Sequence, residues 1–181
     1  MQQAAKELES LRNKPDGRFP TACRQIVRSL PGNGFCVDCQ SPNPDWASVS
    51  HGCLICLQCS GRHRSYGVQT STVRSIDMDN WTYKQVLAML EGGNLQLQVF
   101  FDRNGLGNAS GAIGRRYSTK IAEFYRTNLA KHVLKVSKTG SYKGREVSRQ
   151  RYTRRNSVTA CSYRVQQEYS CYRQQTQFAV Q

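Results

Sequence analysis

Residues 36–68 read CVDCQSPNPDWASVSHGCLICLQCSGRHRSYGV, and this stretch holds five of the eight cysteines in the chain. Two CxxC pairs stand out, Cys36 with Cys39 and Cys56 with Cys59, with sixteen residues between them. Each pair places two thiolates on one side of a tight turn, and two such pairs supply the four ligands of a tetrahedral zinc site. Since four thiolates leave no open position for water, we expect one structural zinc ion that stabilises the fold.

Two other residues compete for the zinc. Cys53 forms a further CxxC pair with Cys56, but we prefer Cys59 because Cys53 can pack as a small apolar residue. His63 could act as a ligand, yet with four cysteines available we expect a packed histidine. The cysteines without a partner at ligand spacing are expected to be free thiols: Cys23, Cys161 and Cys171.

The composition indicates one domain with tails and an affinity for anions. The chain has 181 residues, with 26 Lys+Arg against 12 Asp+Glu, a net charge of +14. Residues 136–181 carry nine of the basic and two of the acidic side chains, so half of the excess lies there. This charge attracts phosphates of nucleic acid or of anionic lipid and does not choose between them. No apolar run is long enough to span a membrane, and the start has no apolar core typical of a secretory signal. We therefore expect a reducing compartment and thiols rather than disulfides.

Apolar residues at helical spacing predict helices on both sides of the cysteines. Thr21 and Thr82 are predicted helix caps, and Phe100 and Phe124 are predicted to face inward. Residues 102–116 are Gly-rich and predict a loop, and the apolar pattern fades after Lys138. The predicted helices cover residues 1–14, 21–30, 82–91, 94–101 and 117–136.

The residues around the cysteines make a family recognisable. They include SPNPDWAS at 41–48, CSGRHRSYGV at 59–68 and STVRSIDMDNW at 71–81, and Gly93-Asn94 follows. These blocks resemble the ArfGAP family, the zinc-dependent GTPase-activating domains for Arf small GTPases. The block Cys-Ser-Gly-x-His-Arg followed by Gly-Val is far more specific than the cysteine spacing. The resemblance runs from about Thr21 to Val136.

The resemblance implies an α+β fold, a small four-cysteine zinc finger with a short β-sheet packed against several α-helices. We expect this domain to cover residues 21–136. Residues 1–20 then form an N-terminal helix and linker, and residues 137–181 a basic tail that we expect to be disordered.

The resemblance also implies an activity, the acceleration of GTP hydrolysis on a GTP-bound Arf. The catalytic arginine of the family falls on Arg64, whose alternative is an ordinary surface arginine. A guanidinium is planar, always cationic and a multiple donor, so it suits the charge that spreads over a transferring phosphoryl group. The partner supplies GTP and Mg²⁺, so we expect an activator rather than an enzyme, and the sequence has no GxxxxGK[ST] motif. A place in vesicle-mediated transport is implied, in the cytoplasm and peripheral to the Golgi or endosomes.

Four further positions match partner-binding residues of the family: Trp46, Leu57, Met78 and Asp79. Trp46 could instead serve core packing, Leu57 could be buried, and Asp79 could be a charge at a helix N-terminus. The chain departs from the usual family pattern at Arg62, Tyr66 and Gln69, which bears on efficiency and on GTPase preference.

Three alternatives remain open at this point. A single-finger nucleic-acid-binding protein would also carry two CxxC pairs and a basic charge, although the apolar helices after the finger make nucleic acid the less favoured partner. A scaffold could bind Arf with little catalysis. The basic tail could attract an anionic membrane or could stay solvated; its basic residues are Lys138, Lys143, Arg145, Arg149, Arg151, Arg154 and Arg155.

Overall fold

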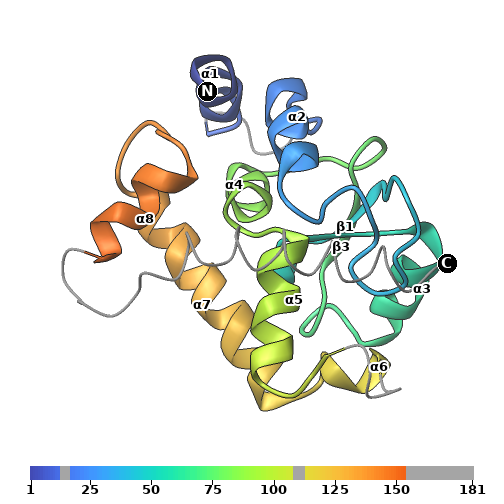
Figure 1. Ribbon diagram of the computed structural model, residues 1–181. Helices are drawn as coiled ribbons and strands as arrows, with labels where there is room; N and C mark the ends of the chain where they lie inside the picture. Colours follow the sequence, from blue (N-terminus) through green and yellow to red (C-terminus); the bar gives the residue numbers. More distant parts are fainter. Residues whose placement is uncertain (13–16, 108–112, 154–181) are drawn as a thin grey trace, which may run out of the picture. The chain divides into compact units, whose positions relative to one another are not determined.

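The computed structural model describes residues 1–12, 17–107 and 113–153 (Figure 1). The chain divides into two compact units, residues 1–145 and residues 146–181. The helices are α1 (Gln2–Ser10), α2 (Thr21–Ser29), the 3-10 helix η1 (Val49–His51), α3 (Leu57–Ser65), α4 (Tyr83–Glu91), α5 (Asn94–Arg103), α6 (Ile113–Arg116), α7 (Lys120–Ser137) and α8 (Arg145–Thr153). The strands are β1 (Trp46–Ser48), β2 (Cys53–Ile55) and β3 (Val73–Ser75). This confirms the predicted α+β class.

The sheet is small and antiparallel, with β1 in the middle and strand order β2-β1-β3. Trp46 on β1 lies opposite Ile55 on β2 and Ser75 on β3. Strands of three residues have too few hydrogen bonds to be stable alone. Packing and the neighbouring cysteines must therefore stabilise this sheet.

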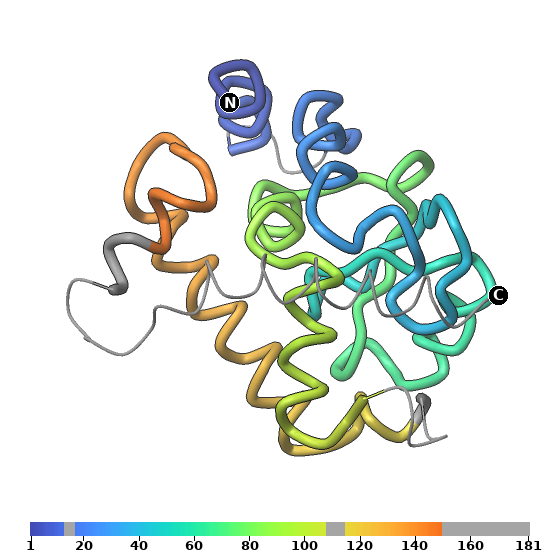
Figure 2. The backbone as a smooth tube through the Cα atoms, viewed as in Figure 1, coloured from blue at the N-terminus to red at the C-terminus, as the bar shows by residue number. Residues whose placement is uncertain are grey.

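Helix α4 is the centre of the helical part. Almost all of its side chains are buried, and it contacts α1, α2, α7 and η1. Figures 1 and 2 show it with α1 and α2 on one side and α7 on the other. As predicted, Thr82 caps it: the Thr82 hydroxyl accepts from the Gln85 N–H at 3.4 Å, and the Gln85 side chain accepts from the Thr82 N–H at 3.0 Å. This reciprocal capping box satisfies two backbone donors at the start of the helix.

The predicted helices are confirmed, with corrections at four places. The N-cap of α2 is Pro20 and makes no side-chain cap bond, so Thr21 is the first helical residue rather than the cap. The predicted loop 102–116 contains the end of α5 and the short helix α6. Helix α7 starts after Thr119, whose hydroxyl accepts from the Ala122 N–H at 3.2 Å. Phe124 is 62% exposed rather than inward, while Phe100 is partly buried as predicted.

Ordered packing continues past residue 136. Tyr142 is buried, and its hydroxyl donates to a carboxylate oxygen of Glu91 at 2.8 Å. Arg12, near the end of α1, donates to the Ser137 carbonyl at 3.0 Å. A helix, α8, follows within the predicted tail. The remaining part of that tail, residues 154–181, lies outside the described residues.

Gly52 permits the close approach of η1 to the end of α4. Its φ is +62°, and a Cβ there would lie 2.7 Å from the Ala88 carbonyl oxygen and 2.9 Å from Gly92 Cα. We expect Gly52→Ala to lower the free energy of unfolding by about 3 kcal/mol, because backbone atoms would have to move and the φ is strained. The matched control is Gly61→Ala in α3, where a Cβ meets nothing within 4 Å. It should raise the free energy of unfolding by roughly 0.5–1 kcal/mol. Urea unfolding of the two variants checks both signs, and equal stabilities would contradict this account of Gly52.

Candidate functional site

The four predicted metal ligands come together. The sulfur atoms of Cys36, Cys39, Cys56 and Cys59 all lie within 4.8 Å of one another. Tetrahedral Zn–S bonds of about 2.3 Å place sulfurs roughly 3.8 Å apart, so this arrangement fits one metal ion. Cys53 is fully buried in β2 and belongs to the hydrophobic core. The cluster of sulfurs therefore contains Cys59 and not Cys53, as the preferred ligand set requires, and binding of a metal by these four residues stays a prediction.

His63 is a packed histidine, as expected, and it does not belong to the cluster of four sulfurs. Its ring is fully buried, with Nδ1 2.8 Å from the Ser71 hydroxyl and Nε2 3.0 Å from an Asp38 carboxylate oxygen. Tyr66 packs its ring against His63 at 5.3 Å between centroids and stacks on Tyr117 at 5.8 Å. Tyr66, where the chain departs from the usual family pattern, therefore packs in an aromatic cluster with His63 and Tyr117.

Asp38 lies between the two cysteines of the first CxxC pair, and its carboxylate contacts α3 and residues 116–117. One of its carboxylate oxygens faces His63, and the other accepts from the Tyr117 hydroxyl at 2.6 Å and from the Arg116 guanidinium. Burial alone would raise the pKa of Asp38, but hydrogen bonds from His63 and Tyr117 and the charge of Arg116 outweigh it and lower that pKa. This network was not predicted from the sequence, and it fixes α3 against the end of α6.

Asp38→Asn is expected to lower the free energy of unfolding by about 3–5 kcal/mol, because the buried Arg116 charge loses its carboxylate. Asp45→Asn is the control, since Asp45 pairs with Arg28 on the surface and should cost no more than about 1 kcal/mol. Chemical unfolding of the metal-loaded variants compares them. A loss at Asp38 as small as that at Asp45 would show that the network contributes little.

Arg64 lies in the last turn of α3 and is exposed. Its guanidinium carbon sits 4.6 Å from the centroid of the Trp46 ring, within cation–π range. The start of α3 is fixed by two of the cysteines, because Cys56 is its N-cap and the Cys56 sulfur accepts from the Cys59 N–H at 3.4 Å. The buried His63 ring, through its contacts with Ser71 and Asp38, fixes the last turn of the same helix. Arg64 is thus an outward-facing guanidinium on a helix held at both ends.

The predicted partner contacts lie on or near the same part of the domain. Leu57 opens α3 and is 68% exposed, so the alternative of core burial is wrong. Met78 is 64% exposed and lies in the loop after β3. Ser75, the last residue of β3, lies directly opposite Trp46. The Asp79 carboxylate accepts from the Ser75 N–H at 2.7 Å and closes this loop. Asp79 lies outside the first turn of α4, which holds no acidic residue, and its carboxylate binds Ser75 instead of the helix N-terminus. Contact of these residues with a partner stays a prediction.

Arg18 was missed by the sequence analysis. Its guanidinium donates to the Asp77 carbonyl at 3.1 Å and to the Met78 carbonyl, so it holds the loop that presents Met78. No local pattern could have indicated this, because the two segments are 59 and 60 residues apart in the chain.

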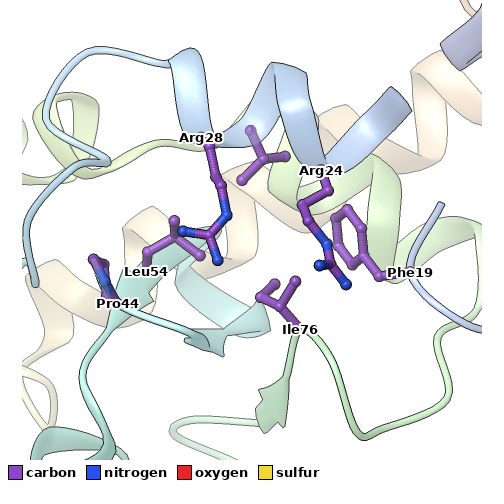
Figure 3. Close-up of a pocket in the computed structure, with 7 residues that line it drawn as sticks. Phe19, Arg24, Arg28, Pro44, Leu54 and Ile76 are labelled. Atoms are coloured by element: carbon purple, nitrogen blue, oxygen red, sulfur yellow. The ribbon is translucent and has the colours of Figure 1, made fainter. Parts of the chain in front are cut away.

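A small hollow lies beside this loop, between α2 and the sheet (Figure 3). It is too shallow to enclose a bound molecule, whereas small-molecule sites have volumes of roughly 300–1,000 Å³. Arg24 and Arg28 reach down into it from α2, and each pairs with a carboxylate, of Asp77 and Asp45. The hollow is therefore a poor candidate for a nucleotide site. Among the described residues, no helix is long and apolar enough to cross a bilayer.

Comparison with known proteins agrees with this arrangement. Residues 21–135 match the family model ArfGap, described as "Putative GTPase activating protein for Arf". The chain belongs to the ArfGAP family. A crystal structure titled "putative GTPase activating protein for ADP ribosylation factor from Cryptosporidium parvum" is 38% identical, with a TM-score of 0.58, and the match covers 62% of this chain and 89% of that one.

Curated relatives match over the same region. The chain is 40% identical over 104 residues to "ADP-ribosylation factor GTPase-activating protein 3" of Rattus norvegicus, which covers 57% of this chain and 19% of that protein. It is 46% identical over 81 residues to "Arf-GAP with ANK repeat and PH domain-containing protein cnt-1" of Caenorhabditis elegans, covering 45% of this chain and 10% of that protein. The chain thus spans a fifth or less of the length of these two relatives.

Proposed function

We propose that this ArfGAP chain accelerates the hydrolysis of GTP bound to an Arf-family small GTPase, with Arg64 acting in trans as an arginine finger. The observation that carries the proposal is the exposed Arg64 guanidinium, held on the Trp46 ring at the end of a helix that begins at two cysteines of the metal site. Membership of the family supports the reaction class.

Arg64 would stabilise charge that develops in the partner's active site. Phosphoryl transfer spreads negative charge over the γ-phosphoryl oxygens and the leaving oxygen, and an arginine supplied in trans is worth about 10³–10⁵ in rate. GTP, Mg²⁺ and the water-orienting residue belong to the partner, so the chain acts as an activator without a nucleotide site of its own. Holding the guanidinium against Trp46 limits its rotamers before docking, which lowers the entropy lost in the transition state.

Zinc is the ion we propose for the four cysteines. Four thiolates in two CxxC pairs form a closed site, so a bound ion has a structural role. The ion would fix the start of α3, and Arg64 lies five residues beyond Cys59 on that helix. The exposed Leu57 and Met78 would supply apolar contact area to the GTPase, with Asp79 shaping the loop that carries Met78.

A nucleic-acid-binding finger is the less favoured reading. Such modules present a basic helix directly after the finger, whereas here Trp81, Leu87 and Leu90 are buried in the core. The other alternative is a scaffold that binds Arf, which would differ from the proposed activator only in the rate of GTP hydrolysis that it produces.

Single-turnover hydrolysis on a panel of purified, GTP-loaded Arf proteins tests the proposal. We expect at least one Arf to hydrolyse GTP about 10³-fold faster or more with the chain present. Binding without acceleration would favour the scaffold. Binding to no Arf, together with a salt-sensitive gel shift on DNA, would favour the nucleic-acid reading.

We also propose a place at the cytoplasmic surface of the Golgi or of endosomes, in vesicle-mediated transport, where a membrane-bound Arf would be the substrate. The basic tail is proposed to add affinity for anionic lipid there. Flotation of liposomes with and without anionic lipid, using the whole chain and a chain ending at residue 145, tests the tail, and no difference between the two chains would exclude it.

Trp46→Leu is expected to lower the single-turnover rate by roughly 3- to 30-fold, the equivalent of a cation–π contact of about 0.5–2 kcal/mol. Trp46→Phe keeps a ring below Arg64 and should recover most of that rate. If both variants lose stability equally and the rate follows stability rather than the ring, Trp46 serves core packing alone.

A further inference from the structure

The outer face of α7 carries an unusual set of side chains. Its inner face, which includes Tyr125, Leu129 and Val133, is buried, and the helix packs against α4. At 3.6 residues per turn, seven exposed residues on the opposite side fall within an arc of about 100°. We call these residues the α7 stripe: Lys120, Phe124, Thr127, Lys131, Leu134, Lys135 and the C-cap residue Lys138.

The stripe is strongly basic. Four of its seven members are lysines, and the nearest acidic residue on the exposed side of the helix is Glu123, at the edge of the arc. Lys120 begins α7, and Lys131, Lys135 and Lys138 lie together at its C-terminal end, so the positive charge is concentrated at that end. Such a basic face is complementary to an anionic surface.

The stripe also exposes two apolar side chains among the lysines. Phe124 is 62% exposed and Leu134 is 43% exposed. They are ten residues apart, which is about 15 Å along the helix axis. The Phe124 ring stacks on Phe100 of α5, with centroids 6.4 Å apart and planes at 14°, so its position is held by the fold. Exposed Phe and Leu between lysines are typical of helices that lie in a membrane interface. The phosphate backbone of a nucleic acid, in contrast, binds the lysines but gains no affinity from an exposed leucine.

We infer that the α7 stripe binds the surface of a bilayer that contains anionic lipids, with the lysines at the headgroups and Phe124 and Leu134 entering the interface. This contact lies within the compact unit of residues 1–145 and does not depend on residues 146–181, although Lys138 belongs both to the stripe and to the predicted tail. In Figure 1, α7 and α3 lie at separate sides of this unit. A membrane bound at α7 would therefore leave Arg64 uncovered.

The test compares the whole chain with two charge-matched variants. Lys131→Glu/Lys135→Glu reverses two lysines of the stripe, and Lys6→Glu/Lys84→Glu reverses two exposed lysines on α1 and α4. Binding is measured by flotation with vesicles of phosphatidylcholine alone and of phosphatidylcholine with about 30% phosphatidylserine. Each lysine near an anionic surface is worth roughly a factor of five in partitioning, so the stripe variant should lose about 25-fold or more. The control variant should lose less than about threefold.

Phe124→Ser separates insertion from charge. It should reduce binding to the phosphatidylserine vesicles severalfold, and the reduction should persist when salt screens the lysines. The charge-reversal variants should keep the thermal unfolding midpoint of the wild type, and Phe124→Ser, which loses its stacking on Phe100, is compared well below its own midpoint. All variants should keep the lipid-free single-turnover rate of the wild type, so a failure here is distinct from a failure of the proposed activity.

Three results would overturn the inference. The wild type could show no preference for phosphatidylserine vesicles, the two charge-reversal variants could lose binding equally, or the stripe variant could lose binding to duplex DNA while keeping its binding to vesicles. The last result would assign the stripe to nucleic acid.

Discussion

Arg64→Ala is expected to slow single-turnover GTP hydrolysis on the Arf partner by about 10³-fold or more, and Arg64→Lys by roughly 10²-fold or more. Lysine keeps the charge but loses the planar group that donates to two oxygens at once. Because Arg64 is exposed and its guanidinium lies on the Trp46 ring at the surface, both variants should keep their fold and their metal. Circular dichroism and metal content check this beside the rate.

Arg62→Ala is the matched control for Arg64. Arg62 is also exposed and lies two residues earlier on α3, where the family usually has an aliphatic residue. We expect its rate to stay within about threefold of the wild type. A loss at Arg62 as large as that at Arg64 would mean that both guanidinium groups contact phosphate, and wild-type rates for both Arg64 variants would remove the proposed mechanism.

Metal removal is expected to unfold the domain. A structural zinc ion held by four thiolates contributes on the order of 10 kcal/mol, which is comparable to the whole stability of a typical domain. The three-residue strands and the start of α3 lie next to the cysteines, so they should be lost first. Adding a strong chelator should red-shift the emission of the buried Trp81 and release one zinc ion per chain, as counted with a zinc-binding dye.

Cysteine variants identify the ligands in the same assay. Cys59→Ala should abolish stoichiometric zinc binding, whereas Cys53→Ala should still bind one ion per chain, because the Cys53 thiol lies in the core. The reverse result would show that Cys53 is the ligand.

Short-range chemistry explains what the sequence could predict. The ligand set follows from the spacing of two CxxC pairs, and the cap of α4 follows from Thr82 with Gln85 three residues later. Both are local patterns: metal ligation requires cysteines at a fixed spacing, and a helix N-terminus requires a hydroxyl with a polar side chain three residues later. The existence of the helices follows similarly from apolar periodicity.

Contacts between distant segments explain what it could not predict. Asp38 meets Arg116 and Tyr117 across 78 and 79 residues, and Arg18 meets the Met78 loop across 60. Phe124 fits the helical spacing of inward residues, yet it lies outside on the Phe100 ring, because periodicity does not distinguish burial from stacking at the edge of a core.

The central claim is that Arg64 acts on the transition state rather than on docking. The most direct test is the affinity of the wild type and of Arg64→Lys for the same Arf in two forms, bound to a non-hydrolysable GTP analogue and bound to GDP with aluminium fluoride, which mimics the transferring phosphoryl group. We predict that both proteins bind the first form within about threefold of each other, while the variant binds the second about 10²-fold more weakly. Equal loss of affinity for both forms, or no loss for either, would contradict the account.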